Sequence, residues 1–388
     1  MHVRPNDQRR LDLIPNPANP RIPFTRPVLP PIAGIQQALA TIWESGHVTN
    51  FGPVQRQFEF ALRDAIGGPF VAAVSNGWSA LRLALASLDL DGEIVISGFT
   101  HPATAQAAAS LGLRPVLADI DLADLNISLE SVERSITTGT TAILATHIFG
   151  NPVDILGLES LARRRGLKLV FDSAAAAGSR YHDRALGDYG DASAFSFHAT
   201  KILSSIEGGA VASNEESVIE QARRLSNFGI RESGSPSLLG MNGKLSEVAS
   251  AVGTASTKLL QDEITARATV HDMYHALLHD EENVEFVASR AGATSNNATV
   301  AVRLQSRRGC DTAKRVSNGL SQRGIEARTY FSGKYAIGLA TDHLPGVTAA
   351  VGQVLCLPCW GEMPASDVDT VCQELRQLLQ KLEMGRSD

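Results

Sequence analysis

Between residues 70 and 173, short apolar runs alternate with runs of helical periodicity. Apolar strands without a polar face suit a parallel sheet that is covered on both sides, and the helices between them supply the crossover connections. The pattern therefore predicts an α/β fold with a mostly parallel sheet. In chain order the runs are FVAAVS, SALRLALASL, EIVISG, ATAQAAASLG, RPVLADI, LESVERSI, TAILATHIF, ILGLESLARRRG and LKLVFDS.

The chain divides into three expected parts. Residues 1–30 are rich in proline, which prevents regular hydrogen-bonded structure, so we expect an extended N-terminal arm. Residues 31–260 form the expected large domain, which begins with two helical runs on either side of the break at Gly52–Pro53. Residues 261–388 show strand-like and helical runs in an α+β pattern, and one helical run from residue 247 to residue 280 leads into them.

The composition excludes several classes of protein. The net charge of −6 lacks the basic excess of nucleic-acid binders. No apolar run approaches the roughly 18 residues of a membrane span, and the polar N-terminus lacks the apolar core of a signal peptide. The four cysteines are too few for a disulfide framework. We expect a cytoplasmic protein that binds neither nucleic acid nor membranes.

The first candidate site is the stretch VSNGWSALRL at residues 74–83. A strand ends here, Gly77 permits a close backbone approach, and a helix begins near Trp78. Free amides at a helix start, together with the positive end of the helix dipole, bind anions. An ordinary strand–helix turn explains the same residues. The G-x-G-x-x-G fingerprint is absent, which argues against a nicotinamide-dependent oxidoreductase.

Three polar residues follow apolar strands further along the chain. Asp172 ends the run LKLVFD, Ser196 ends another strand, and Lys201 closes the segment FSFHATK. Strand carboxyl ends line the ligand crevice of open α/β sheets. Partial burial suits a lysine to form a Schiff base with a carbonyl cofactor. Alternatives are a helix cap for Asp172 and a Lys201 side chain that reaches solvent. An amine, a carboxylate and an anion site together describe a pocket for pyridoxal 5′-phosphate.

These motifs resemble those of the nucleotide-sugar aminotransferases of the DegT/StrS type, and they keep the family order from about residue 48 to residue 260. The resemblance implies the pyridoxal-phosphate-dependent transferase fold type I, that of aspartate aminotransferase. Such a fold has a large domain with a seven-stranded sheet and a smaller C-terminal α+β domain. The matching stretches are NFGPVQRQFE, SNGWSALRLAL, GFTHPATAQA, HIFGNPVDI, the segment 171–211, NFG and GMNGKLSEV.

The resemblance assigns catalytic and phosphate-binding roles. Lys201 matches the lysine that forms the Schiff base with the cofactor and moves the proton during transamination. Asp172 matches the carboxylate that keeps the pyridine nitrogen protonated. Ser196 matches a phosphate ligand, and the backbone amides of Gly77 and Trp78 match two others.

Two further positions are implied by the resemblance alone. His101 occupies the place of the aromatic residue that stacks on the pyridine ring. Asn242 matches an asparagine that reaches the phosphate of the neighbouring subunit's cofactor. The implied active unit is therefore a homodimer with composite active sites.

Three residues depart from the family pattern. Trp78 replaces a threonine whose hydroxyl would join the phosphate ligands. Ala175 replaces a glutamine or histidine that would bond the phenolic oxygen of the cofactor. His101 offers less stacking surface than a larger aromatic side chain. These departures leave the substrate open.

Other conspicuous residues have plain explanations. Cys356 and Cys359 have redox-motif spacing but lie in an apolar strand-like run, so we expect a structural role. His147 ends a strand and is expected either to line the crevice or to be buried. We expect no metal site from a histidine stripe that lacks partner ligands, namely His271, His275 and His279.

The resemblance implies an aminotransferase that moves an amino group from L-glutamate to a nucleotide-linked keto-sugar and so forms an amino-deoxysugar for a polysaccharide or glycosylated metabolite. Related dehydratases carry a histidine where this chain has Lys201, so amine transfer is favoured. The alternatives are a dehydratase or lyase on the same fold, and an altered member with a binding or regulatory role, to which Trp78 and Ala175 point.

Overall fold

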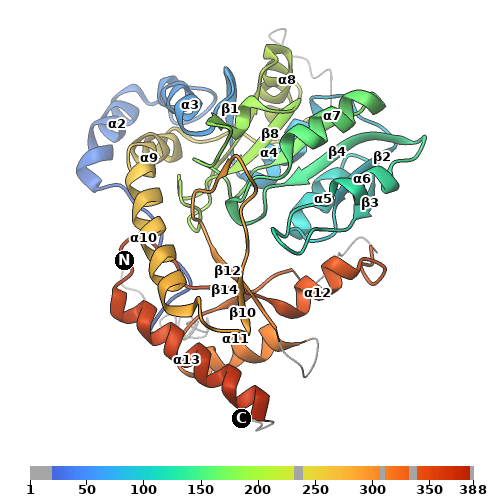
Figure 1. Cartoon of the computed structure of the whole chain (residues 1–388). Helices are drawn as coiled ribbons and strands as arrows, with labels where there is room; N and C mark the ends of the chain where they lie inside the picture. Colours follow the sequence, from blue (N-terminus) through green and yellow to red (C-terminus); the bar gives the residue numbers. More distant parts are fainter. Residues whose placement is uncertain (1–19, 231–238, 306–310, 332–338, 385–388) are drawn as a thin grey trace, which may run out of the picture.

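A computed structural model describes residues 20–230, 239–305, 311–331 and 339–384. Its largest element is a seven-stranded sheet of strand order β1-β9-β8-β5-β4-β2-β3 (Figure 1). Strand β9 is antiparallel to both neighbours, and the other pairs are parallel. The predicted α/β fold with a mostly parallel sheet is therefore confirmed. The strands are β1 (Phe70–Val74), β2 (Glu93–Ser97), β3 (Arg114–Ala118), β4 (Thr140–Thr146), β5 (Lys168–Asp172), β8 (Ala192–Ser196) and β9 (Gly209–Ser213).

Helices cover both faces of this sheet, which explains why its strands are apolar throughout (Figure 1). On β4, Ala142 and Leu144 pack into one core, whereas Ile143 and Ala145 pack into the other. The first face is covered by α4 (Gly77–Ala86), α5 (Pro102–Ala109) and α8 (Glu216–Ser226). The second is covered by α3 (Pro53–Ile66), α6 (Leu129–Ser135) and α7 (Ile155–Arg165).

The helical runs before and after the sheet pack together. Helix α2 (Ile32–Ser45) and α3 form on either side of the predicted break, and both pack against α9 (Glu247–Thr257). The expectation of one helical run from residue 247 to 280 is wrong, because the chain turns between α9 and α10 (Leu260–Leu278). Just before the turn, the hydroxyls of Thr254 and Thr257 donate to the carbonyls of Ser250 and Thr254, a contact that weakens a helix.

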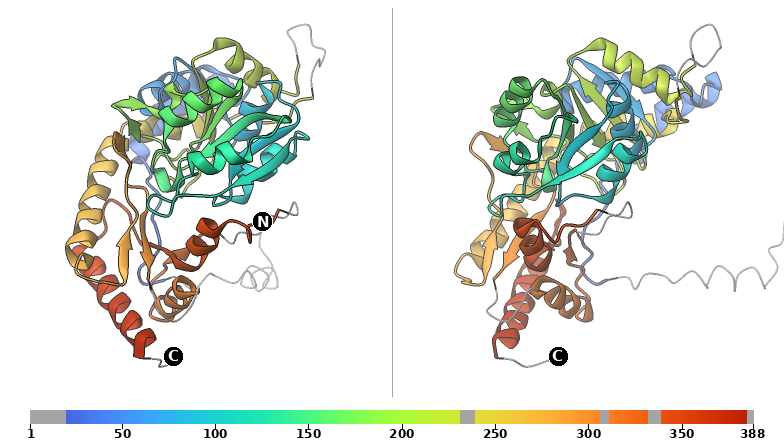
Figure 2. Two further views of the ribbon diagram at one scale, coloured as in Figure 1. Left: turned by 45° about the vertical axis from the view of Figure 1, so that its right-hand side comes forward. Right: turned by 90° about the vertical axis from the view of Figure 1, so that its right-hand side faces the viewer.

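A second core lies around a four-stranded antiparallel sheet of order β10-β12-β14-β13. Helix α10 leads from the large sheet to this core and runs alongside α13 (Figure 2). Because Val270, Tyr274 and Leu278 of α10 belong to the second core, we propose residue 260 as the domain boundary. The elements are β10 (Val284–Phe286), β12 (Val300–Leu304), β13 (Arg328–Thr329), β14 (Val354–Leu357), α11 (Thr312–Gln322), α12 (Pro345–Gln353) and α13 (Ala365–Met384).

Two features tie the halves of the chain together. The described end of the N-terminal arm pairs with the second core, where Ile22 bridges Ile325 and the Cys359 amide donates to the Phe24 carbonyl at 3.0 Å. An unexpected three-stranded sheet joins β6 (Arg180–Tyr181) and β7 (Arg184–Ala185) to β11 (Ala293–Thr294). Across the described ranges, no helix combines the length and apolar character that crossing a membrane requires.

Candidate functional site

The carboxyl ends of β1, β5 and β8 bring the predicted site residues to one edge of the large sheet. Asp172 is the last residue of β5 and pairs in register with Ala194 of β8. Ser196 ends β8 two residues further on, and β1 leads directly into α4. Crevices outside such strand ends are the usual ligand sites of open α/β sheets.

The start of α4 has the features of an anion cradle. Asn76 caps the helix by accepting a hydrogen bond from the Ser79 amide at 2.8 Å. The amides of Gly77 and Trp78 have no hydrogen-bond partner within the residues that the structure describes. A Cβ atom on residue 77 would lie 2.6 Å from Ser196 Cβ and 2.8 Å from its Oγ, so the glycine lets this hydroxyl approach the helix start. Two amides, one hydroxyl and the positive helix end thus gather at one point.

Asp172 is buried and held by two hydrogen bonds. It is only 5% exposed. Thr104 Oγ1 donates to its Oδ2 at 2.7 Å, and the Ala174 amide donates to its Oδ1 at 3.2 Å. Residues 173–179 form turns without a helix, so the alternative of a helix cap for Asp172 is wrong.

Lys201, Asp172 and His101 interact electrostatically. Burial lowers the pKa of Lys201, and the Asp172 carboxylate opposes this shift. Burial also lowers the pKa of His101, an effect that Asp172 opposes and Lys201 reinforces. The Lys201 amine has neither a hydrogen bond nor an ion pair with any described residue. Lys201 is partly exposed by its accessible surface, and burial is the chief cause of its lowered pKa.

His101 begins α5 as its cap. Its Nδ1 accepts a hydrogen bond from the Ala103 amide at 3.1 Å, so the proton of the neutral ring is on Nε2. The ring meets Phe331 edge-on, with 6.3 Å between centroids. His101 is therefore an exposed residue whose Nδ1 is occupied and whose ring edge contacts Phe331.

Asn242 lies beside the end of β1. It bridges Asn227, and its Oδ1 accepts a hydrogen bond from Lys244 Nζ at 3.0 Å. Lys244 in turn bridges Val74, the last residue of β1. Among the contacts of the described residues, none joins Asn242 to Asp172 or Lys201 directly.

Two sets of residues around Asp172 were not predicted from the sequence. The hydroxyls of Thr100, Thr104 and Thr146 form a chain that ends on its carboxylate. Asn296, which is fully buried, donates through Nδ2 to the carbonyls of Ala175 and Ala177 at 2.8 and 2.9 Å. Threonine and asparagine are too common for their positions alone to have indicated either set.

The other conspicuous residues are structural. His147 is buried and stacks on Phe171, with 4.9 Å between ring centroids, and burial lowers its pKa to about 3. Phe171 packs into the core on the sheet face opposite that of Asp172. Burial raises the pKa values of Cys356 and Cys359, which both lie in the interior. In the described ranges, no group of histidine, cysteine or acidic residues could hold a metal ion.

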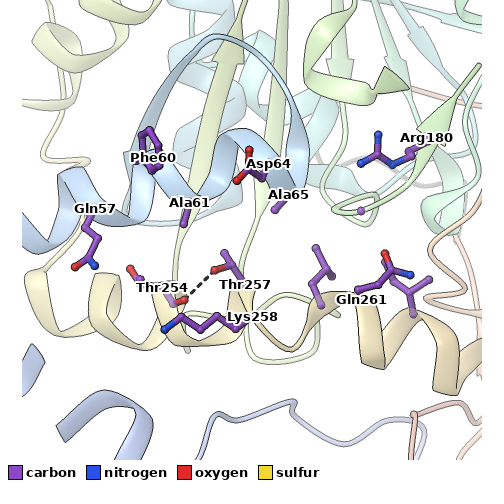
Figure 3. Close-up of a pocket in the computed structure, with 13 residues that line it drawn as sticks. Gln57, Phe60, Ala61, Asp64, Ala65, Arg180, Thr254, Thr257, Lys258 and Gln261 are labelled. Carbon is purple, nitrogen blue, oxygen red and sulfur yellow. Dashed lines mark hydrogen bonds between the residues drawn. The ribbon is translucent and has the colours of Figure 1, made fainter. Parts of the chain in front are cut away.

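A separate hollow lies between α3 and the turn from α9 to α10 (Figure 3). Its charged side chains are of both signs, namely Asp64, Arg180 and Lys258. One dashed contact in Figure 3 is the bond from Thr257 Oγ1 to the Thr254 carbonyl at 2.8 Å. None of the predicted site residues lines this hollow.

Comparisons with known proteins decide the family. The profile of the DegT/DnrJ/EryC1/StrS aminotransferase family matches residues 32–376. The chain belongs to this family. It is 30% identical over 361 residues to the dTDP-4-amino-4,6-dideoxy-D-glucose transaminase of Shigella dysenteriae, covering 91% of this chain and 98% of the relative. It is 35% identical over 327 residues to protein Rv3402c of Mycobacterium tuberculosis, covering 81% and 77%.

A solved structure agrees with the fold of this family member. DesI, crystallised in the presence of its TDP-sugar product, superimposes with a TM-score of 0.88 at 29% identity and covers 94% of each chain. The protein is therefore a pyridoxal-phosphate-dependent aminotransferase of fold type I. These relatives give no support to the dehydratase or regulatory alternatives.

The residues at the sheet edge fit pyridoxal phosphate. The phosphate needs hydrogen-bond donors, and two unpartnered amides at the start of α4 lie beside the Ser196 hydroxyl. The aldehyde needs an unprotonated amine, and burial lowers the pKa of Lys201. The pyridine nitrogen needs a carboxylate, and Asp172 has no competing ion pair with a described residue.

Proposed function

We propose that this aminotransferase moves an amino group from L-glutamate to a nucleotide-linked keto-sugar and so makes an amino-deoxysugar. Three relatives support this substrate class by their names. Besides the Shigella dysenteriae transaminase, the GDP-perosamine synthase of Vibrio cholerae is 32% identical over 254 residues, and the DesI structure was determined with a TDP-sugar product. All three act on or hold a nucleotide-linked sugar, so that class is the common element.

The observation that carries the proposal is the Lys201 amine, which has a lowered pKa, no described partner and Asp172 nearby. Pyridoxal phosphate, when bound, supplies an aldehyde that takes up the amino group and a ring that accepts an electron pair. Lys201 Nζ then removes and returns the substrate's α-proton, because burial lowers its pKa and so favours the free amine. Asp172 keeps a proton on the ring nitrogen, and the α4 cradle holds the phosphate.

His101 would cover one face of the cofactor ring. Its Nδ1 is occupied by the Ala103 amide, which holds the imidazole in one orientation. A neutral imidazole is planar and can cover the ring, and burial is the main cause that lowers its pKa. This role stays a proposal that a His101→Phe variant tests, since a larger ring should maintain or tighten cofactor binding.

We further propose that the active unit is a cytoplasmic homodimer in which Asn242 reaches the partner's phosphate. Four of the exposed large apolar side chains gather on one group of elements, and such a group is typical of interaction surfaces. They lie on α2, on α3 and in the segment between them, and their exposed fractions are Ile32 73%, Trp43 71%, Val48 52% and Phe60 67%. Burial of this group by a second copy would remove these side chains from water.

Two half-reactions test the activity. L-Glutamate added to the yellow, cofactor-loaded protein should bleach the visible absorbance and release 2-oxoglutarate. A panel of dTDP-, UDP- and GDP-linked keto-sugars should then restore the absorbance with one or a few members. Lys201→Ala should show neither change, and normal turnover by this variant would contradict the proposal.

A mixing experiment tests the composite site. Lys201→Ala and Asn242→Ala proteins, each inactive alone, are unfolded together, refolded and assayed. A hybrid dimer would contain one site without either substitution, so about a quarter of the wild-type activity should return. If no activity returns although light scattering shows dimers, Asn242 does not act across the interface.

A further inference from the structure

Three threonine hydroxyls form a chain that ends on Asp172. Thr104 Oγ1 lies 2.7 Å from Asp172 Oδ2, Thr100 Oγ1 lies 2.9 Å from Thr104 Oγ1, and Thr146 Oγ1 lies 2.9 Å from Thr100 Oγ1. Thr100 and Thr104 are fully buried. Thr100 follows β2, Thr104 lies in the first turn of α5, and Thr146 ends β4. Hydroxyls from three separate parts of the fold are therefore joined in one chain, and Thr104 connects that chain to the carboxylate.

The hydrogen bonds of this chain can run in one direction only. An ionised carboxylate accepts hydrogen bonds and donates none, so Thr104 donates to Asp172. A hydroxyl carries a single proton, and that of Thr104 is now used. Thr100 must therefore donate to Thr104, and by the same reasoning Thr146 donates to Thr100. Each bond in such a chain polarises the next.

The backbone register places both ends of the chain. Thr146 and Asp172 are partners in the parallel pairing of β4 with β5. The second carboxylate oxygen, Oδ1, accepts from the Ala174 amide. Both oxygens of Asp172 are thus held, one by the local backbone and one by a hydroxyl that is itself held from two other elements.

We propose that Thr146, Thr100 and Thr104 orient the Asp172 carboxylate toward the ring nitrogen of the cofactor. Thr104 acts by direct contact with Asp172, and the other two act through Thr104. All three are positioning residues, because none of them needs to touch substrate or cofactor. The inference rests on the proposed function insofar as Asp172 is the partner of the ring nitrogen.

Thr104→Val in the full chain is the primary test, because valine keeps the shape and removes the hydroxyl. The dissociation constant of the cofactor-free chain for pyridoxal phosphate should rise about 3- to 10-fold. The single-turnover rate constant with L-glutamate should fall about 10- to 100-fold, as expected for a lost hydrogen bond to a charged group. Thr104→Ser restores the donor and should recover most of both losses.

The size of the effect should decrease along the chain. Thr100→Val should slow the single turnover about 3- to 10-fold, and Thr146→Val about 2- to 3-fold, because each acts through one more bond. If Thr104→Val does not fold, as judged by its melting temperature, Thr100→Val compared with Thr100→Ser decides the question.

Thr140→Val is the matched control. Thr140 begins β4, the strand that Thr146 ends, and its hydroxyl also donates to a buried carboxylate, that of Glu93 at 3.3 Å. It lies at the opposite edge of the sheet, so the cofactor affinity and the single-turnover rate should stay within about twofold of wild type while stability falls.

The outcomes separate this inference from the proposed function. If Asp172→Asn impairs both readouts but Thr104→Val impairs neither, the hydroxyl chain is refuted and the role of Asp172 stands. Equal losses in Thr104→Val and Thr104→Ser would also refute it, since packing and not the hydroxyl would then matter. If Asp172→Asn itself changes neither readout, the role of Asp172 fails, and the chain fails with it.

Discussion

The close contact between Gly77 and Ser196 allows a direct test of the anion cradle. A Cβ atom on residue 77 would lie 2.6 Å from Ser196 Cβ and 2.8 Å from Ser196 Oγ. Such distances do not occur between real side chains, so Gly77→Ala must displace either Ser196 or the first turn of α4. After that displacement, the Ser196 hydroxyl and the α4 amides no longer face the same point.

The size of the loss follows from the number of hydrogen bonds. One hydrogen bond to a charged group contributes about 1.5–3 kcal/mol, or about 10- to 100-fold in affinity. Ser196→Ala removes one such bond and leaves the helix start intact, so it should weaken pyridoxal phosphate by that factor. Gly77→Ala disturbs the hydroxyl and at least one adjacent amide, so it should weaken binding by about 100-fold or more.

The assay compares two ligands that differ only in the phosphate. Spectrophotometric titration of the cofactor-free chain gives the affinity for pyridoxal phosphate and for pyridoxal. Gly77→Ala should weaken the first and leave the second nearly unchanged. The double variant Gly77→Ala/Ser196→Gly removes the clashing atoms and should return to the affinity of Ser196→Ala. Gly34→Ala is the control, because nothing lies within 4 Å of its added Cβ. Equal weakening of both ligands, or of neither, would refute the cradle.

Three further predictions concern buried groups. The rate of cofactor capture by the Lys201 amine, followed by stopped flow, should be half-maximal below pH 10.5. Asp172→Asn should lower that midpoint further, because the Asp172 carboxylate raises the pKa of the amine. An unchanged midpoint in the variant would contradict this. Asn296→Ala should lower the free energy of unfolding in urea by about 2–4 kcal/mol, because the carbonyls of Ala175 and Ala177 lose their donor. A loss under about 1 kcal/mol would contradict this role of Asn296. Burial lowers the pKa of His147 to about 3, so below pH 6.5 the imidazole binds a proton in the unfolded chain but not in the folded one. The free energy of unfolding should therefore fall by about 2 kcal/mol at pH 5. His147→Asn should remove this pH dependence of the urea midpoint.

Much of the fold could be predicted because it depends on local patterns. Strands that are apolar on both faces, separated by amphipathic helices, have few arrangements other than a parallel sheet between two helical layers. The same pattern placed Asp172 and Ser196 at strand ends, where the geometry of such a sheet makes them neighbours. The break in the helical run after Thr257 was missed, because threonine hydroxyls that bond the helix backbone leave no mark in the hydrophobic period.

The site is only partly visible in the sequence, because its supporting contacts join residues far apart in the chain. Gly77 and Ser196 are separated by more than a hundred positions in the chain. The lack of a Cβ atom on residue 77 nevertheless decides whether the Ser196 hydroxyl can lie at the start of α4. The sequence alone determined which polar residues end strands and which lysine and carboxylate are candidates for the site, since both follow from residue type and local periodicity. Only the tertiary structure decided that Thr104 reaches Asp172 and that Asn296 reaches the loop after it, since packing of separate elements brings those side chains within hydrogen-bond distance.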